Sequence, residues 1–286
     1  MQQQRSVRDI SYADSAQTKG GRAVIRTMEN LTGRMRLIKR VAGYDRDIAQ
    51  GRDFWDVMVE RYGLSLQVVT GSLGNIPKDK PLILVANHPY GILDGMMMGH
   101  ILRQTRGDFK ILANDAFCAA SDLSDVILPI SFKTTKEAVA LNLATRKTAL
   151  GYLEQGGAIG IFPGGGVATS ARLFSKPMDP GWRAFTARMV SKSDAVVVPV
   201  FFEGQCSRLF QIASHLHMTL RAGLLIREFK ARVDTPVRVH IGAVLGRDQL
   251  DPMRGDGKSL VAFLRAKTYE LSPTLIDPAS VGYKWD

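Results

Sequence analysis

The sequence predicts an α/β fold in which helices flank a largely parallel central sheet and an amphipathic helical cap precedes it. Short runs rich in apolar and β-branched residues recur along the chain, each with the length of a buried strand. Longer segments with helical spacing separate most of these runs, which is typical of parallel strands joined by helical crossovers. The predicted strands are 65–69, 81–87, 109–113, 126–130, 158–162, 195–202 and 237–241.

The helical segments differ in how well their ends are marked. Residues 136–153 are the clearest helix, because Gly156 and Gly157 follow as a stop signal, whereas Gly33 weakens the case for one unbroken helix over 22–41. Pro199 lies inside a strand and donates no ladder hydrogen bond, so we expect an edge strand or a bulge there. The predicted helices are 22–41, 45–62, 94–103, 136–153, 182–190, 209–232 and 258–271.

Composition divides the chain into four parts. Residues 1–20 are polar and are expected to be a disordered tail, 21–63 form a membrane-facing cap of basic amphipathic helices, 64–250 form the main domain, and 251–286 form a C-terminal helix and tail. We find no internal repeat.

The net charge of +11 indicates a polyanionic partner, either nucleic acid or an anionic membrane surface. No stretch approaches the roughly 18–20 apolar residues that span a bilayer, and the polar start does not resemble a secretory signal. The two cysteines, Cys118 and Cys206, lack metal-type spacing and are expected to be reduced thiols in a cytoplasmic setting.

The segment 22–40 combines an apolar stripe with six basic residues and one acidic residue. A basic amphipathic helix is typical of a membrane-surface element, and the cations expected to bind anionic lipid are Arg34, Arg36, Lys39 and Arg40. Alternatively, the stripe packs on the main domain and leaves a solvated basic face. The two interpretations are compatible.

A histidine ends the second predicted strand, with a carboxylate six positions on at the start of a helix. The strand would fix the His88 imidazole, Asp94 would accept one ring N–H, and the other nitrogen would be free to take a proton. Pro89 stiffens the turn between them. The alternative is a hydrogen-bonded structural histidine.

A glycine loop follows the strand 158–162, and its residues are Phe162, Pro163, Gly164, Gly165 and Gly166. Successive glycines let backbone N–H groups face an anionic or carbonyl oxygen. A dinucleotide site is disfavoured, because the third glycine of G-x-G-x-x-G is replaced by Thr169 and Pro163 interrupts the turn. A plain tight turn is the other alternative.

Other chemistries lack their motifs. The sequence has no G-x-S-x-G elbow and no Walker A loop, and the remaining histidines have no metal-ligand spacing, so no metal site is expected. The run Met96, Met97 and Met98 suits either core packing or an acyl-chain wall.

The segment 87–95, N-H-P-x-G-x-x-D-G, resembles the first motif of the glycerolipid acyltransferases, in particular the hemolysin-like or lyso-ornithine-lipid subgroup. The usual spacing is H-x4-D, and the extra residue between His88 and Asp94 falls around Gly91, where a loop can absorb it. The glycine loop resembles F-P-E-G-[TS]-R, and 198–200 is similar to a later hydrophobic-proline motif. The resemblance spans about residues 64–245 in family order.

This resemblance implies a glycerolipid acyltransferase-like fold and acyl transfer from acyl-CoA or acyl carrier protein to a lyso-lipid hydroxyl. It implies His88 as general base, Asp94 as its orienting carboxylate, and no metal or tightly held cofactor. It also implies a peripheral protein on the inner face of the cell membrane. The residues it implies at the substrate are Asn87, Gly91, Phe162, Pro163, Gly164, Gly165 and Gly166.

Two departures bear on the acceptor. Gly164 replaces the motif's Glu and Gly166-Val167 replace its Thr/Ser-Arg, which argues against a glycerol-3-phosphate-type acceptor. A lyso-aminolipid such as lyso-ornithine lipid is therefore favoured over lysophosphatidic acid. Arg172 and Arg208 are the nearest cations that would substitute.

Two other functions remain open at this point. One is a degenerate acyltransferase fold that binds lipid without turnover, which the Glu missing at position 164 leaves open. The other is a basic α/β protein that binds nucleic acid. Its basic residues cluster in an amphipathic stretch rather than among RNA-reading aromatics, so nucleic acid is not expected as a partner.

Overall fold

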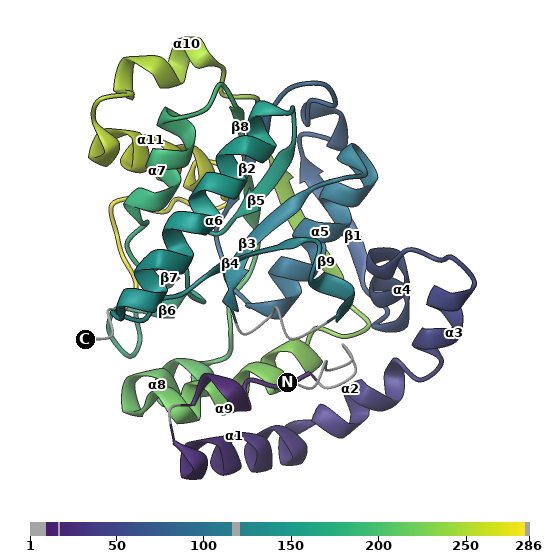
Figure 1. Cartoon of the computed structure of the whole chain (residues 1–286). Helices are drawn as coiled ribbons and strands as arrows, with labels where there is room; N and C mark the ends of the chain where they lie inside the picture. Colours follow the sequence, from purple (N-terminus) through teal and green to yellow (C-terminus); the bar gives the residue numbers. More distant parts are fainter. Residues whose placement is uncertain (1–9, 17, 116–120, 284–286) are drawn as a thin grey trace.

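The computed structural model describes residues 10–16, 18–115 and 121–283, and over these residues the central sheet has seven strands in the order β1-β9-β8-β2-β5-β3-β4 (Figure 1). Every neighbouring pair is parallel except β8 with β9, so the predicted largely parallel sheet is confirmed. The strands are β1 Ser65–Thr70, β2 Leu82–Ala86, β3 Lys110–Asn114, β4 Ile127–Ile130, β5 Ala158–Ile161, β8 Val196–Phe202 and β9 Pro236–Ile241.

Helices cover both faces of the sheet, so a central strand such as β2 is buried on both sides. For this reason every residue of β2 is apolar. Leu82 and Leu84 point into one core layer, while Ile83 and Val85 point into the other. The first layer is closed by α4 (Phe54–Arg61), α5 (Ile92–Arg106) and α9 (Met218–Lys230). The second is closed by α6 (Lys136–Glu154), α7 (Ala184–Ser191) and α11 (Gly257–Tyr269).

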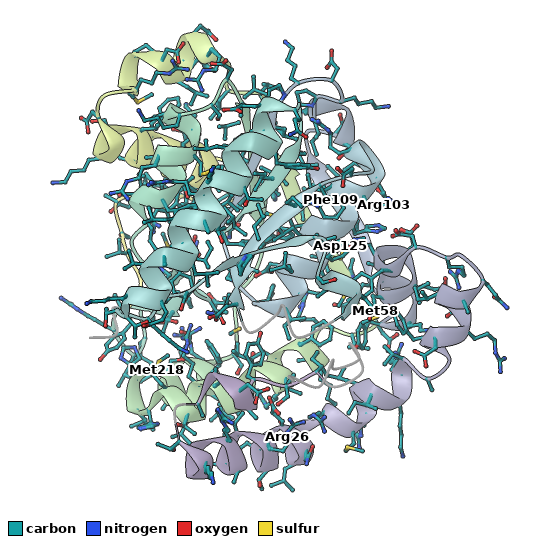
Figure 2. The ribbon with its side chains drawn as sticks, in the orientation of Figure 1. Arg26, Met58, Arg103, Phe109, Asp125 and Met218 are labelled. Carbon is teal, nitrogen blue, oxygen red and sulfur yellow. The ribbon has the colours of Figure 1, made fainter. Side chains whose placement is uncertain are left out.

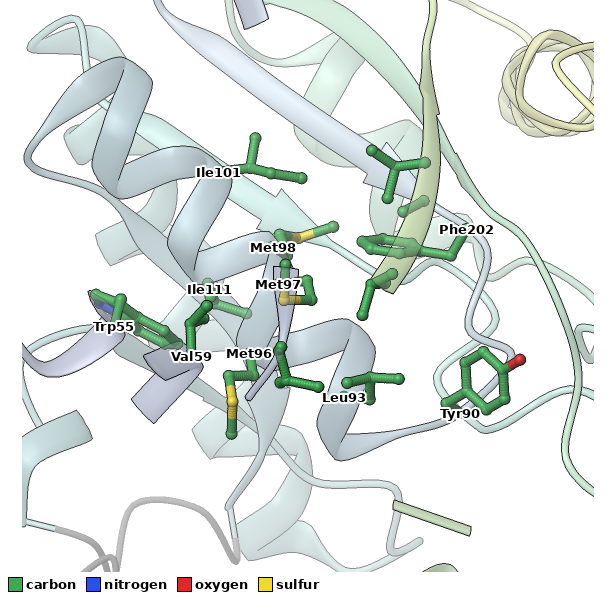
Figure 3. Close-up of a cluster of buried hydrophobic side chains, with 14 of the residues drawn as sticks. Trp55, Val59, Tyr90, Leu93, Met96, Met97, Met98, Ile101, Ile111 and Phe202 are labelled. Carbon is green, nitrogen blue, oxygen red and sulfur yellow. The ribbon is translucent and has the colours of Figure 1, made fainter. Parts of the chain in front are cut away.

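The methionine run of α5 lies inside the first core layer (Figure 3). Met97 and Met98 are fully buried, and a Cβ at Gly160 of β5 would come within 2.4 Å of the Met98 sulfur. These side chains therefore fill the space between α5 and the sheet. Of the two roles expected for the methionine run, this is core packing.

Three segments predicted as single helices are broken. Gly33, with φ of 134°, separates α1 (Lys19–Thr32) from α2 (Arg34–Arg40), as its sequence position suggested. The predicted helix 45–62 is α3 (Tyr44–Ala49) and α4, with Asp53 capping α4. The predicted helix 209–232 is α8 (Arg208–Leu216) and α9. It breaks at extended His217, whose Nδ1 accepts from Thr219 N.

The N-terminal segment differs from the predicted disordered tail over residues 10–16, where a 3₁₀ turn (Ala13–Ser15) forms. Ser11 Oγ and Tyr12 N donate to the carboxylate of Glu29 at 2.6 Å each. Glu29 is buried in α1 and requires donors, which explains why this polar segment folds back. Residues 1–9 and 17 lie outside the described part.

Pro199 lies in a central strand rather than at the edge, because β8 pairs with both β2 and β9. The alternative prediction, a bulge, is closer. Three positions separate Val197 from Val200, whereas four separate their partners Leu245 and Ile241. Gly242 N donates to Pro199 O at this irregularity, so the ladder tolerates the missing proline donor.

The remaining elements are β6 (Thr169–Ser170), β7 (Pro177–Met178), α10 (Arg247–Leu250) and 3₁₀ turns at Leu73–Asn75, Ser121–Leu123 and Asp251–Met253. Within the described ranges, no helix is long and apolar enough to cross a bilayer. Cys206 is a buried free thiol, and Cys118 lies outside the described residues.

Candidate active site

The turn after β2 is held by bonds across the sheet. Asn87 Nδ2 donates to Phe202 O at 2.9 Å, and Phe202 N donates to Asn87 Oδ1 at 2.7 Å. These bonds fix the end of β2 to the end of β8. The structure thus places Asn87, predicted as a substrate contact, as the support of the neighbouring His88.

His88 and Asp94 are brought together as the spacing predicted. Nδ1 of His88 lies 3.1 Å from Oδ2 of Asp94, an ion-pair distance, although the ring is not aligned for a straight hydrogen bond. The carboxylate is fully buried, and the same oxygen accepts from the backbone N–H groups of Tyr90 (2.7 Å) and Gly91 (3.0 Å). Gly91 has a φ of 86°, a conformation that favours glycine in this turn.

Gly91 is also closely surrounded. A Cβ there would lie 3.1 Å from Val167 and 3.2 Å from the hydroxyl of Tyr12, which the N-terminal segment brings to the start of α5. Burial raises the pKa of the Tyr12 phenol, so it stays protonated beside Asp94. Gly91 is therefore a packing position at the base of the site.

The imidazole of His88 stacks on Phe162, the first residue of the glycine loop, with ring centroids 4.1 Å apart. The side chain of His88 remains 17% exposed. The backbone is fixed as well, because His88 N donates to Asp179 Oδ1 at 3.0 Å and Ala168 N donates to His88 O at 2.8 Å. His88 is thus fixed in position and open on one side.

Asp179 is a second buried carboxylate that the sequence did not reveal. Besides His88 N, it accepts from Trp182 Nε1 at 2.9 Å, and burial raises its pKa despite these donors. A Cβ on Gly164 would lie 3.2 Å from the Cβ of Asp179, so Asp179 fills the space behind the glycine loop. Asp179 has no motif spacing to His88 in the sequence, and only the fold joins them.

The glycine loop leaves backbone donors unbonded. Gly165, with a φ of 67°, donates its N–H to Phe162 O at 2.9 Å, and Pro163 O accepts from Arg183 N at 3.0 Å. The N–H groups of Gly164 and Gly166 make no hydrogen bond to any residue that the structure describes. They are free to bind a substrate oxygen.

Arg183 is the cation that adjoins this loop. Its guanidinium stacks on Phe132 at 4.4 Å, and a Cβ on Gly165 would lie 3.3 Å from its Nε. Arg172 and Arg208 are exposed in the β6–β7 turn and at the start of α8, and among described residues neither bonds to His88, Asp94 or the glycine loop. Sequence reasoning missed Arg183 because its proximity depends on the turn at Pro163.

The four predicted lipid-binding cations differ in availability. Arg34 is 8% exposed and donates to Ile10 O at 2.9 Å, and Arg40 pairs with Asp234. Arg36 and Lys39 are exposed on α2.

The site therefore combines a fixed, partly open histidine with free backbone donors, and this arrangement suits base-assisted attack on a carbonyl carbon. No group of three metal-ligating side chains occurs within the described parts of the chain.

Comparison with known proteins adds three observations. The family model described as Acyltransferase matches residues 48–277. The chain is 28% identical over 161 residues to a lyso-glycine lipid O-acyltransferase of Phocaeicola vulgatus, and 30% identical over 161 residues to one of Bacteroides thetaiotaomicron. Each alignment covers 56% of this chain and about half of the relative, 54% and 56% respectively.

A solved structure is also similar, namely the 1-acyl-sn-glycerophosphate (LPA) acyltransferase PlsC of Thermotoga maritima. The TM-score is 0.47 at 14% sequence identity, covering 93% of this chain and 87% of that one.

Proposed function

The chain belongs to the acyltransferase family, and we propose that it moves a fatty acyl group from acyl-CoA or acyl carrier protein to the hydroxyl of a lyso-lipid. The observation that carries this proposal is the pairing of His88 with buried Asp94 beside a loop in which the N–H groups of Gly164 and Gly166 have no partner among the described residues. The names of the two curated relatives support a lyso-lipid acceptor.

In the proposed mechanism, His88 acts as general base through Nε2, because its Nδ1 faces Asp94. The acceptor hydroxyl gives its proton to Nε2 as its oxygen attacks the thioester carbonyl carbon. Asp94 keeps the proton on Nδ1 and stabilises the imidazolium that forms.

The negative charge then moves to the former carbonyl oxygen. In this proposal, the N–H groups of Gly164 and Gly166, which have no partner among the described residues, donate to this oxygen. When the C–S bond breaks, the leaving thiolate takes the proton from the imidazolium. The thioester supplies the activation, so the proposal uses no metal or resident cofactor.

We further propose a lyso-aminolipid acceptor, such as a lyso-ornithine or lyso-glycine lipid, in preference to lysophosphatidic acid. Gly164 backs directly on Asp179 and Pro180, so the space behind the loop already holds a carboxyl group. A phosphate acceptor would need a compensating cation, since charge-assisted bonds are about twice as strong as neutral ones. Arg183 adjoins the loop, but its guanidinium is stacked on Phe132.

The protein acts, in this proposal, from the surface of an anionic membrane on the cytoplasmic side. The exposed cations Arg36 and Lys39 on α2 suit this role, and each contributes about 1 kcal/mol near such a surface.

The test is a competition with purified protein, equimolar lyso-glycine lipid, lyso-ornithine lipid and lysophosphatidic acid, and either acyl-CoA or acyl carrier protein as donor. Product masses identify acceptor and donor together. We expect the aminolipid products to dominate. Preferential acylation of lysophosphatidic acid would contradict the acceptor assignment, while lipid binding without any product would identify a degenerate binding protein.

A further inference from the structure

The outward face of α8 and the adjacent β6–β7 turn form an apolar surface that no described residue covers. Phe174 is 78% exposed and Leu216 is 70% exposed, although such side chains are normally buried. We call this surface the apolar patch, and its residues are Leu173, Phe174, Leu209, Ile212, Leu216 and Met218. A clustered apolar surface marks an interaction site.

Helix α8 is apolar on two sides. Its inward side buries Phe210 and Ala213 against the protein. Its outward side carries Leu209, Ile212 and Leu216, whose spacing of three and four residues places them in one row. A helix with apolar residues on both sides requires a second partner.

Strand β6, which leads into the turn, is bonded to the same helix. Ser170 N donates to Gln211 Oε1 at 2.9 Å, and His215 Nε2 lies 2.8 Å from Ser170 O. Figure 1 shows β6 and β7 close to α8. Met218, labelled in Figure 2, follows α8 as the first residue of α9 and is 49% exposed.

The charged residues within the segments that form the patch are basic. Arg172, Lys176 and Arg208 are exposed within the same segments. Neither 168–178 nor 207–227 contains an acidic residue. A row of apolar side chains flanked by basic residues complements the interface of an anionic bilayer, because the apolar groups enter the acyl boundary and the cations meet the headgroups.

The patch is also coupled to the active site. Buried Arg221 of α9 donates to Val167 O at 2.7 Å and to Ser214 Oγ of α8 at 3.0 Å. The adjoining Ala168 N donates to His88 O. The loop beside His88 therefore continues within a few residues into Leu173 and Phe174 of the patch.

We propose that the apolar patch inserts into the headgroup–acyl boundary of an anionic bilayer and holds the His88 site against the membrane surface. Why the protein would need this anchor rests on the proposed function. Insertion itself does not, because it is measured without turnover. It adds to the cations of α2 an apolar anchor on a different element.

The experiment compares two matched pairs of substitutions in the full chain. Phe174→Ser with Leu216→Ser removes the two most exposed members of the patch, whereas Val139→Ser with Leu143→Ser removes residues of α6 that are 56% and 50% exposed. Binding is measured by flotation with vesicles of phosphatidylglycerol and phosphatidylcholine. We expect the patch pair to lose at least about tenfold in affinity and the α6 pair to bind as the wild type does. Unchanged melting temperatures verify folding.

A second measurement reports insertion directly. The tryptophan of Phe174→Trp should shift to shorter emission wavelength on these vesicles and be quenched by brominated acyl chains, and that of Leu143→Trp should not. Equal binding by both serine pairs, or an unquenched Trp at 174, would overturn the proposal. So would a dimer that the patch pair abolishes without loss of vesicle binding. Transfer to a short-chain acceptor below its micelle concentration reports the catalytic site separately, so failure there points to the proposed function and not to the patch.

Discussion

The turn after β2 and the loop after β5 end neighbouring parallel strands, yet their backbone groups are bonded in opposite ways. In the turn, the N–H and C=O of His88 and the N–H groups of Tyr90 and Gly91 all have protein partners. In the loop, the N–H groups of Gly164 and Gly166 have no partner among the described residues. The turn therefore fixes one side chain, whereas the loop leaves two backbone donors unpaired within this part of the chain.

The largest expected effect on turnover comes from substitutions in the turn after β2. His88→Ala should lower kcat about 10²–10⁴-fold, the usual contribution of a general base, with little change in melting temperature because the ring is partly exposed. Asp94→Asn should lower kcat as well, because the amide favours the wrong tautomer. Steady-state turnover is the measurement.

The control for this prediction is a second histidine–aspartate pair. Nδ1 of His100 lies 3.2 Å from Asp56 Oδ1, far along α5 from the turn, so His100→Ala should leave turnover unchanged. Near-normal turnover in His88→Ala would rule out the proposed mechanism.

The loop provides the next largest effect. Gly165→Ala forces a side chain onto a φ of 67° and brings its Cβ within 2.9 Å of Phe132. If the neighbouring N–H groups stabilise an oxyanion, their displacement should lower kcat about tenfold to a hundredfold with a smaller change in KM. Gly151→Ala in α6, where the added Cβ meets nothing within 4 Å, is the control. An unchanged kcat in Gly165→Ala would mean that the loop is a plain turn.

The same contrast explains how much the sequence could predict. The strands of the sheet were found because apolar runs are a local signal, and His88 with Asp94 because both lie in one short segment. Asp179 reaches the site from a later segment through its carboxylate, which accepts from His88 N, and Arg183 through its N–H, which donates to Pro163 O. Neither has a spacing that identifies it.

Bonds between residues far apart in the sequence also determine the structure of the N-terminal region. Arg34 belongs to a basic row in the sequence, yet its guanidinium is bonded to Ile10 O across 24 residues. Composition cannot reveal this pairing, because it is fixed by how distant segments pack. The break at His217 is local instead, since its own side chain caps α9.

A smaller effect concerns the carboxylate behind the loop. Burial raises the pKa of Asp179 above 3.8, so the native state keeps this proton to a higher pH than the unfolded chain does. The stability from the protonated form is complete below pH 3.8 and is lost as the pH rises through the folded-state pKa. The free energy of unfolding of the wild type should therefore fall relative to that of Asp179→Asn across this window. Urea unfolding at a series of pH values checks the sign. A difference that grows in the opposite direction would show that Trp182 and His88 N–H outweigh burial.

The smallest effect separates the two kinds of cation on α2. Reversing exposed Arg36 and Lys39 to Glu should weaken binding to phosphatidylglycerol-containing vesicles by at least about tenfold at low salt, and make it less salt-sensitive, since each contributes about 1 kcal/mol. Lys136→Glu with Lys147→Glu on α6 changes the net charge equally and is the control. Arg34→Glu is expected to fail differently, by releasing residues 10–16 and lowering the melting temperature, because its bond to Ile10 O is lost. Equal losses from the α2 and α6 pairs would mean that total charge, and not the position of α2, attracts the membrane. No loss from either pair would leave α2 with a packing role alone.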